Sequence, residues 1–285
     1  MLRDESQIFD KRFLYYYLSS KPTYEKLRSM AVGGVVNNLN SEMVRGVFVP
    51  VPDKVEQSGV ADVLDKVKNI ITLRKQEHQR LDELIKARFV EMFSNENCQR
   101  MQLDSLAFGK GEYGAQSASI VYDANRPRYV RITDINDDGS LNDDFVSSSN
   151  YADDEQYKLC YGDFLFARMG ATVGKTYAYK SGNQIFAGYL IRYKLNTEKI
   201  LPEYLFVYTK TEEYLNWVQL NQSGAAQPGI NAKKYGSLLI PTQKIEKQKE
   251  FVSFVAQIDK SKVAVQKSLE ETQLLFDKLM QEYFG

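Results

Sequence analysis

The last third of this 285-residue chain repeats its first third, so that residue i of the first copy matches residue i + 191 of the second. Identical pairs at this spacing are Leu14 and Leu205, Tyr17 and Tyr208, Gly33 and Gly224, Asn40 and Asn231, Pro50 and Pro241, Gln57 and Gln248, Leu84 and Leu275, and Phe93 and Phe284. A repeat at a fixed spacing indicates one copied structural module. Residues 98–200 have no counterpart ahead of residue 10, so the first copy lacks the front half of that module.

Composition narrows the class of protein. With 43% hydrophobic and 26% charged residues, the chain is ordinary for a globular protein that can form two domains. It has no apolar run near the roughly 18 residues of a membrane span and no apolar signal segment at its start. Cys98 and Cys160 lie outside any CxxC or Cys/His pattern, which predicts reduced thiols in a cytoplasmic protein without a metal or other cofactor. The net charge of zero gives no electrostatic argument for a nucleic-acid partner.

Two segments have the heptad pattern of long helices, one from after Asp53 to about Phe93 and one from after Pro241 to the C-terminus. Each would be about 40 residues and therefore roughly 60 Å long. Such helices need a partner for their apolar stripe, and the repeat predicts that they pair as an antiparallel coiled coil with the only histidine, His78, in the seam. The predicted seam residues are Val60, Leu64, Val67, Ile71, Leu81, Ile85, Phe251, Val255, Ile258, Val265, Leu269 and Phe276.

Residues 98–243 read as a mixed α+β domain, with short β-rich runs separated by turn residues and a helical stretch that opens at Pro202. The expected strands are residues 119–122, 129–132, 163–167, 175–179, 187–193 and 238–241. The predicted domains are residues 1–52 (the remnant of a first such domain), 53–97 (first long helix), 98–243 (complete domain) and 244–285 (second long helix).

The remnant is expected to contain a helix from Phe13, a loop over residues 31–40 and a strand over residues 47–50. About 50 residues without most of a sheet can bury too little surface for independent stability. We therefore expect this segment to be poorly ordered or to need a complementing surface.

Three motifs suggest ligands but lack the necessary context. GKGEYG at 109–114 is followed by a predicted strand, not by the helix of a dinucleotide site. GATVGKT at 170–176 is one residue short of a phosphate-binding loop and is also followed by a strand pattern, so a turn between two strands is expected. The acidic stretch 134–144 meets the EF-hand spacing only in part, which favours a solvated turn. With no nucleophile elbow and no convincing nuclease carboxylate cluster, the sequence favours a binding protein over an enzyme.

Several stretches together resemble one family. They are GKGEYG with PRYVRITDIN, LCYGDFLFARMGATVGKT, LPEYLFVYTK, QSGAAQPGINAKKYGSLLIP, and IEKQKEFVSFVAQID at the start of the second long helix. In this combination they are similar to the specificity (S) subunits of type I restriction-modification systems. The resemblance covers residues 98–285 well, and residues 10–97 resemble the end of a first recognition domain with its helix.

The resemblance implies a non-catalytic subunit in which each recognition domain reads one half of a bipartite site in double-stranded DNA. It also implies that the paired helices fix the spacing of the halves and dock methyltransferase (M) subunits, through which restriction (R) subunits join. The sequence departs from the pattern at its front, where about 100 residues of a first domain are missing. A truncated product, one half of a split subunit, and a chain that pairs with a second copy or a complementary fragment all remain open.

Base edges are read chiefly by Arg, Lys, Asn and Gln side chains. Two turn-rich loops, residues 166–175 and 222–234, are the main candidates, and Arg168→Ala or Lys175→Ala is expected to weaken DNA binding with little loss of stability. Alternatives are a coiled-coil module that binds protein or sugar, and an enzyme detached from a larger polypeptide. The candidate DNA-binding residues are Lys110, Tyr113, Gln116, Arg126, Arg128, Arg168, Thr172, Lys175, Gln222, Ser223, Gln227, Asn231, Lys233 and Lys234.

Overall fold

The computed structural model describes residues 7–30, 41–94, 98–150, 155–223 and 228–285. Its backbone contacts divide the chain into unit 1 (residues 1–81 and 259–285) and unit 2 (residues 82–258). The α-helices are α1 (Lys11–Ser19), α2 (Lys21–Met30), α3 (Ser41–Arg45), α4 (Lys54–Phe93), α5 (Pro202–Tyr208), α6 (Glu212–Asn221), α7 (Ala232–Gly236) and α8 (Ile245–Phe284). The 3-10 turns are η1 (Leu103–Leu106), η2 (Ile132–Asp134), η3 (Glu155–Tyr157) and η4 (Gly170–Thr172).

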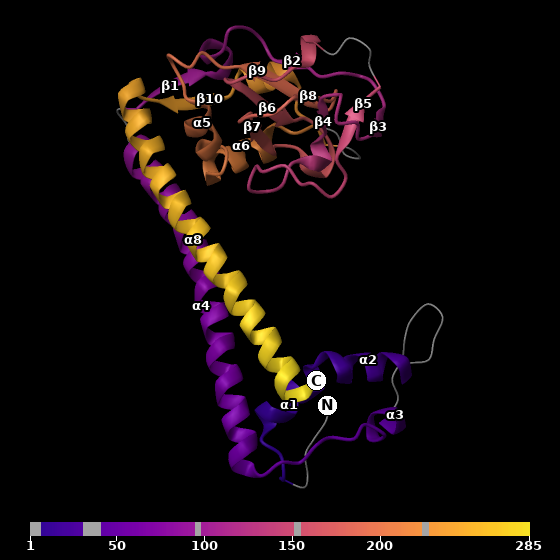
Figure 1. The fold of residues 1–285 in the computed structure, drawn as a ribbon. Helices are drawn as coiled ribbons and strands as arrows, with labels where there is room; N and C mark the ends of the chain where they lie inside the picture. Colours follow the sequence, from indigo (N-terminus) through magenta and orange to yellow (C-terminus); the bar gives the residue numbers. More distant parts are fainter. Residues whose placement is uncertain (1–6, 31–40, 95–97, 151–154, 224–227) are drawn as a thin grey trace. The chain divides into compact units, whose positions relative to one another are not determined.

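Helices α4 and α8 are each 40 residues long, and within each unit they lie side by side and run in opposite directions (Figure 1). The start of α4 is fixed by Asp53, whose carboxylate accepts the Glu56 N–H at 2.8 Å. The predicted antiparallel helix pair is therefore confirmed. Of the predicted seam residues, Leu64, Val67, Ile71, Ile85, Phe251 and Val265 are buried, and Val60, Leu81, Val255, Ile258, Leu269 and Phe276 are partly buried.

Unit 2 contains the sheets. One four-stranded sheet has the order β2-β9-β6-β7, a second has the order β3-β5-β4-β8, and β1 pairs with β10. All strand pairs are antiparallel except β4 with β8. The strands are β1 (Gln99–Gln102), β2 (Glu112–Tyr113), β3 (Ser119–Val121), β4 (Arg128–Val130), β5 (Ser147–Ser149), β6 (Asp163–Ala167), β7 (Thr176–Ala178), β8 (Gln184–Phe186), β9 (Leu190–Lys194) and β10 (Leu239–Thr242).

The core of unit 2 joins the first sheet to the helix pair. Every residue of β6 is buried, because helices cover one face of its sheet and the second sheet packs near the other. Aromatic rings link α4 to α5 and α8: the ring centroids of Phe93 and Tyr204 are 4.8 Å apart, and those of Phe89 and Phe251 are 5.5 Å apart. These contacts anchor the sheet to the helices.

The predicted mixed α+β fold is confirmed, and β6 occupies the predicted residues 163–167. The expected turn between strands is also confirmed, because β6 and β7 pair directly across residues 168–175. The sequence pattern did not predict β1, β2, β5 and β8, which are short and lack an apolar alternation. It also merged α5 and α6, which separate at Thr211, whose side chain caps α6.

The internal repeat appears as matching elements. Helices α2, α3 and α4 correspond residue for residue to α6, α7 and α8 at the spacing of 191, and α1 corresponds to α5. The Gln57 amide accepts the Asp10 N–H and donates to Ile8 O and Pro52 O. Gln248 makes the same three bonds one repeat later, with Leu201 N, Lys199 O and Gln243 O. Each glutamine is fully buried, and it ties the start of a long helix, α4 or α8, to the residues just before α1 or α5.

One predicted element of the first copy is wrong. Residues 47–50 do not form a strand, although their counterparts in the second copy belong to β10. A β-strand exists only through hydrogen bonds to a neighbour. Strand β10 has β1 as its neighbour, whereas none of the described residues pairs with residues 47–50.

Among the described residues, none of the helices combines the length and the apolar character that crossing a bilayer requires.

Candidate functional site

The two loops that the sequence singled out lie against each other in unit 2. The Gly170 N–H donates to Pro228 O, and the Ile230 N–H donates to Arg168 O, both at 2.9 Å. Arg168 follows β6 directly, while residues 228–231 lead into α7. The fold thus joins two segments that are about 60 residues apart into one surface beside the end of β6.

Arg168 is held between two tyrosine rings at this surface. Its guanidinium carbon lies 4.9 Å from the ring centroid of Tyr113 and 5.6 Å from that of Tyr189, and its Nε donates to Gly188 O at 3.1 Å. Within the described part of the chain, no acceptor binds Nη1 or Nη2. The planar outer edge can therefore bind a carboxylate, a phosphate or the O6/N7 edge of guanine.

The tyrosines are themselves fixed in place. Tyr113 Oη accepts the Ala232 N–H at 3.2 Å, which connects β2 to the start of α7. Tyr189 is 53% exposed and directly follows Gly188. The end of the Gln116 side chain lies against Gly188, because a Cβ at residue 188 would be 2.2 Å from the Gln116 amide nitrogen. Gln116, another predicted DNA-binding residue, therefore lies next to Gly188, whose carbonyl oxygen accepts the Arg168 Nε–H.

A buried ion cluster supports the strand that carries Tyr113. Arg192 on β9 is almost fully buried and pairs with Glu112 on β2 and, at 3.5 Å, with Asp163 on β6. Burial raises the pKa of the Asp163 carboxyl above its usual value, although Arg192 opposes this shift. Since Glu112 precedes Tyr113, the ion cluster fixes the backbone of β2 beneath the exposed ring.

The second loop contributes polar groups with mixed roles. Asn231 accepts the Lys234 N–H at 2.9 Å and so caps α7. Lys234 Nζ donates to Asn221 O at 2.7 Å, while Lys233 is exposed. Gln222 is half-buried and Ser223 is exposed and bridged to Gly229. Gln227 lies outside the described residues.

The remaining candidates of the first loop are held by its own turn or by a neighbour. Thr172 Oγ1 donates to Met169 O at 3.2 Å and closes η4. Lys175 Nζ pairs with Asp137 at 2.7 Å and donates to Ile135 O. Lys110 is exposed just before β2. Only Arg168 of this loop combines a fixed guanidinium with an open edge among the described residues.

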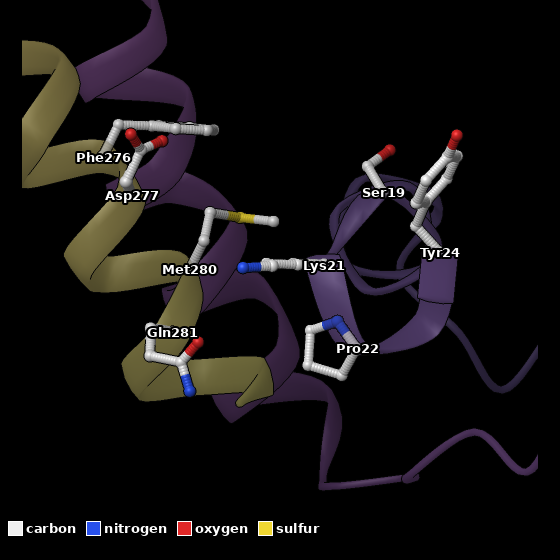
Figure 2. Close-up of a pocket in the computed structure, with 8 residues that line it drawn as sticks. All are labelled: Ser19, Lys21, Pro22, Tyr24, Phe276, Asp277, Met280 and Gln281. Atoms are coloured by element: carbon white, nitrogen blue, oxygen red, sulfur yellow. The ribbon is translucent and has the colours of Figure 1, made fainter. Parts of the chain in front are cut away.

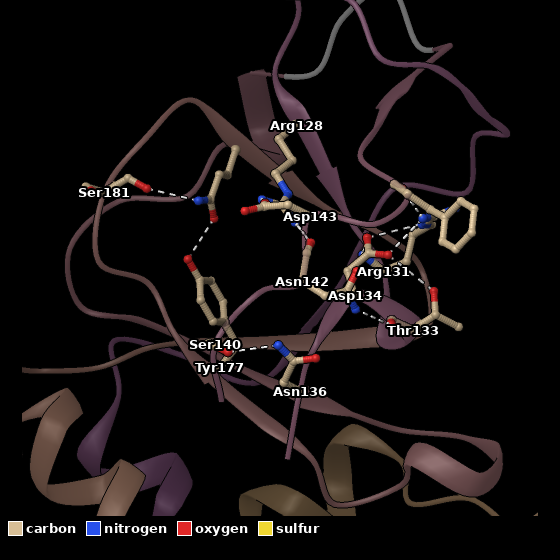
Figure 3. A network of polar contacts seen from close by, with 12 residues as sticks. Arg128, Arg131, Thr133, Asp134, Asn136, Ser140, Asn142, Asp143, Tyr177 and Ser181 are labelled. Carbon is tan, nitrogen blue, oxygen red and sulfur yellow. Dashed lines mark hydrogen bonds and ion pairs between the residues drawn. The ribbon is translucent and has the colours of Figure 1, made fainter. Parts of the chain in front are cut away.

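Arg126 and Arg128 belong to a different surface. Arg128 is mostly buried and binds Asp143 Oδ1 at 2.8 Å and the Asn142 carbonyl, within a network that also pairs Arg131 with Asp134 (Figure 3). Arg126 donates to Ser149 O at 3.1 Å. The guanidinium of Arg128 is therefore bonded within the domain, and these bonds hold the acidic loop 134–144 in place.

Lys210, which the sequence reading did not single out, lies beside the same acidic loop. Its Nζ donates to Asp137 O at 2.8 Å and lies 4.6 Å from the ring centroid of Phe206. Burial lowers its pKa to about 8, although Asp138 and Asp137 oppose the shift. The charged form of Lys210 therefore opposes folding near neutral pH.

We expect Lys210→Met to remove part of the pH dependence of stability. Between pH 8 and the ordinary lysine pKa of 10.5, the unfolded chain binds more protons than the folded chain, so the free energy of unfolding should rise with pH in this window. The variant should lack that rise. Urea unfolding of both proteins at pH 7, 8, 9 and 10 measures the difference, and parallel pH profiles would contradict the assignment.

A pocket of about 510 Å³ lies elsewhere, in unit 1, between the α1–α2 junction and the last turns of α8. Figure 2 shows Lys21 extending towards Met280, with Tyr24 and Phe276 at the sides. None of the candidate residues of the sequence reading for DNA contact lines it. The candidate site is the surface beside Arg168, where Tyr113, Gln116 and Tyr189 gather. We call it the Arg168 surface and include Gln222 and Ser223, from the second loop, whose Ser223 bridges to Gly229.

Comparisons with known proteins agree with this architecture. The family described as type I restriction modification DNA specificity domain matches residues 2–83 and 99–273. The specificity subunit of the type I restriction enzyme EcoKI from Escherichia coli (strain K12) is 22% identical over 283 residues, with 90% of this chain and 60% of that protein covered. The chain therefore spans about 60% of the length of this curated relative.

Solved structures of the same class have the same fold. A chain from a type I restriction-modification assembly superposes with a TM-score of 0.66 at 17% identity, over 99% of this chain and 73% of that one. The type I specificity subunit from M. genitalium superposes with a TM-score of 0.56 at 14% identity, over 97% and 73% of the two chains. The match of the family model extends over both copies of the repeat, and this chain belongs to the family of type I restriction-modification specificity proteins.

Proposed function

We propose that this chain is a non-catalytic subunit that reads one half of a double-stranded DNA site through the Arg168 surface of unit 2. The observation that carries the proposal is the clamped guanidinium. The Arg168 guanidinium lies beside the rings of Tyr113 and Tyr189, its Nε is bonded to Gly188 O, and its outer edge is open among the described residues. An arginine edge held in this way suits bidentate binding to guanine in the major groove.

The surrounding groups suit the same role. Exposed Lys110 and Lys233 supply positive charge near β2 and α7 for phosphates, and Gln116 and Gln222 can donate to and accept from base edges. Because the net charge of the chain is zero, phosphate contacts alone would supply limited affinity. We infer that binding depends on assembly with a second DNA-binding protein.

The helix pair supplies a surface for such an assembly. In unit 1, α4 carries Val63, Ile70 and Leu73 on a face next to its buried stripe, all more than a third exposed. Val263 and Leu274 are exposed on α8. Apolar stripes that remain in water are typical of protein-binding surfaces. We propose that methyltransferase subunits bind here, and that restriction subunits join through them.

The test combines the chain with its methyltransferase partner. Methylation of host DNA, sequenced with and without the gene, should reveal one modified motif that disappears when the gene is deleted. Gel shifts with the purified partner should show binding to that motif and not to a scrambled duplex. If the two proteins associate but the methylome and the gel shifts show no sequence preference, the chain is a coiled-coil module for a partner other than DNA.

A further inference from the structure

We propose that Gln116 and Arg168 read two consecutive base pairs of the DNA site, with Gln116 bound to the adenine of an A·T pair and Arg168 to the guanine of a G·C pair. This assignment rests on the proposed function, because it takes the Arg168 surface as the one that reads DNA. It adds the base pairs that the surface selects. Gly188 lies between the two side chains and sets their spacing.

The segments that carry the two side chains are bonded to consecutive residues just before β9. The Gly188 N–H donates to Ala115 O at 2.8 Å, and the Arg168 N–H donates to Tyr189 O at 3.0 Å. The Cα atoms of consecutive residues are about 3.8 Å apart across a trans peptide. Neighbouring nucleotides of one DNA strand are about 3.4 Å apart along the helix axis. The two anchoring points therefore have nearly the spacing of two consecutive base pairs.

The backbone on both sides of Gln116 is fixed from within the domain. The hydroxyl of buried Tyr129 donates to Ala115 O at 2.7 Å and, over a longer distance, to Ser117 O at 3.1 Å. Gln116 itself is exposed between these two carbonyl groups. A polar side chain on a fixed backbone has less freedom to lose on binding, which favours contact with one base edge.

The end of the Gln116 side chain occupies the space that Gly188 leaves empty. A Cβ at residue 188 would lie 2.2 Å from Gln116 Nε2 and 2.9 Å from Oε1. Nε2 also donates to Gly114 O at 3.4 Å, which uses one of its two hydrogens. Within the described part of the chain, Oε1 accepts no hydrogen bond. The second Nε2 hydrogen and Oε1 are the donor and the acceptor that adenine N7 and N6 require.

The carbonyl group of the same glycine holds the arginine. Gly188 O accepts the Arg168 Nε–H at 3.1 Å, so one residue touches the amide of Gln116 and the guanidinium of Arg168. The guanidinium fits O6 and N7 of guanine, and the amide fits N6 and N7 of adenine. All four atoms lie in the major groove, so a single approach of unit 2 to that groove can bring both side chains to their bases.

The test uses the full chain assembled with its methyltransferase partner, and duplexes in which each position of the modified motif is varied in turn. We expect the motif to contain a G·C pair next to an A·T pair. Gln116→Ala should lower the preference for this A·T pair about tenfold or more and leave the preference for the G·C pair unchanged. The affected pair should neighbour the one whose preference is lost in Arg168→Ala. Because Gln116 is uncharged, the salt dependence of binding should stay the same.

Two further variants test the chemistry and the position of the amide. Gln116→Glu should move the preference at the same position from A·T to C·G, because a carboxylate accepts from cytosine N4. Gly188→Ala keeps the carbonyl group that binds Arg168, but its Cβ displaces the flexible end of Gln116. It should therefore match Gln116→Ala at the A·T pair and the parent chain at the G·C pair.

Gly188→Ala and Gln116→Ala combined should weaken binding no more than Gln116→Ala alone, since both remove the same contact. Urea unfolding of each variant checks that the fold is kept, and the exposed Gln116 side chain can be shortened without opening the core.

Three results would overturn this assignment and leave the proposed function in place. The first is a Gln116→Ala protein with the base preferences of the parent chain at every position. The second is a lost preference at a position that does not neighbour the one affected by Arg168→Ala. The third is a Gly188→Ala protein that keeps its preference for the A·T pair. A methylome without a gene-dependent motif, or an Arg168→Ala protein with unchanged base preferences, would instead overturn the proposed function itself.

Discussion

Replacing Gln248 with leucine should lower the free energy of unfolding of unit 2 by about 3 kcal/mol or more. The side chain is fully buried and makes three hydrogen bonds, with Leu201 N, Lys199 O and Gln243 O. Leucine fills a similar volume but leaves one donor and two acceptors without these partners. The start of α8 would also lose its connection to the chain ahead of α5.

The single tryptophan makes this loss measurable. Trp217 packs against Tyr214 and Tyr235 in the core of unit 2, so its fluorescence reports unfolding of that unit in urea. Gln57→Leu is the matched control, because Gln57 makes the same three bonds in unit 1. It should move the fluorescence transition much less. Equal shifts for both variants would mean that the two units unfold together. No shift for Gln248→Leu would contradict the stabilising role of the Gln248 hydrogen bonds.

The long helices were predictable because their signal is local and repeated. Heptad spacing over 40 residues defines a buried stripe, and the copy of that stripe 191 residues later identifies the partner. The strand over residues 47–50 was predicted from the same kind of local signal and is wrong. Its apolar residues match β10, but pairing depends on β1, a segment whose counterpart the first copy lacks. Local pattern cannot show whether a strand has a neighbour.

The candidate site divides in the same way. The loops around Arg168 and Ile230 could be chosen from their turn residues, and hydrogen bonds between them bring them together. Tyr189 was missed because its position in an apolar run gives no indication that its ring is exposed; the glycine before it was the available signal. Arg128 is the opposite case. Its charge suggested a contact with DNA at the surface, whereas its side chain binds Asp143 within the domain.

Arg168→Ala should weaken binding of the assembled methyltransferase complex to its cognate site by about 10- to 100-fold, which corresponds to the roughly 1–3 kcal/mol of a bidentate arginine–guanine contact. Binding to non-specific DNA should change little, because the lost contact is to a base edge. Stability should be nearly unchanged, since Arg168 donates one hydrogen bond and its guanidinium otherwise packs on exposed rings. Titrations of cognate and scrambled duplexes, with a urea melt of each variant, give the three quantities.

Two further variants separate geometry from charge. Arg168→Lys keeps the charge but loses the fork and the Nε bond to Gly188 O, so it should resemble alanine on cognate DNA if the fork reads a base. If the residue binds a phosphate instead, lysine should restore affinity and Arg168→Ala should lower the salt slope by about one. Lys175→Ala is the comparison within the same loop, because Lys175 pairs with Asp137. An unchanged affinity of Arg168→Ala across the salt series would remove this residue from the DNA interface, and with it the argument that the Arg168 surface reads sequence.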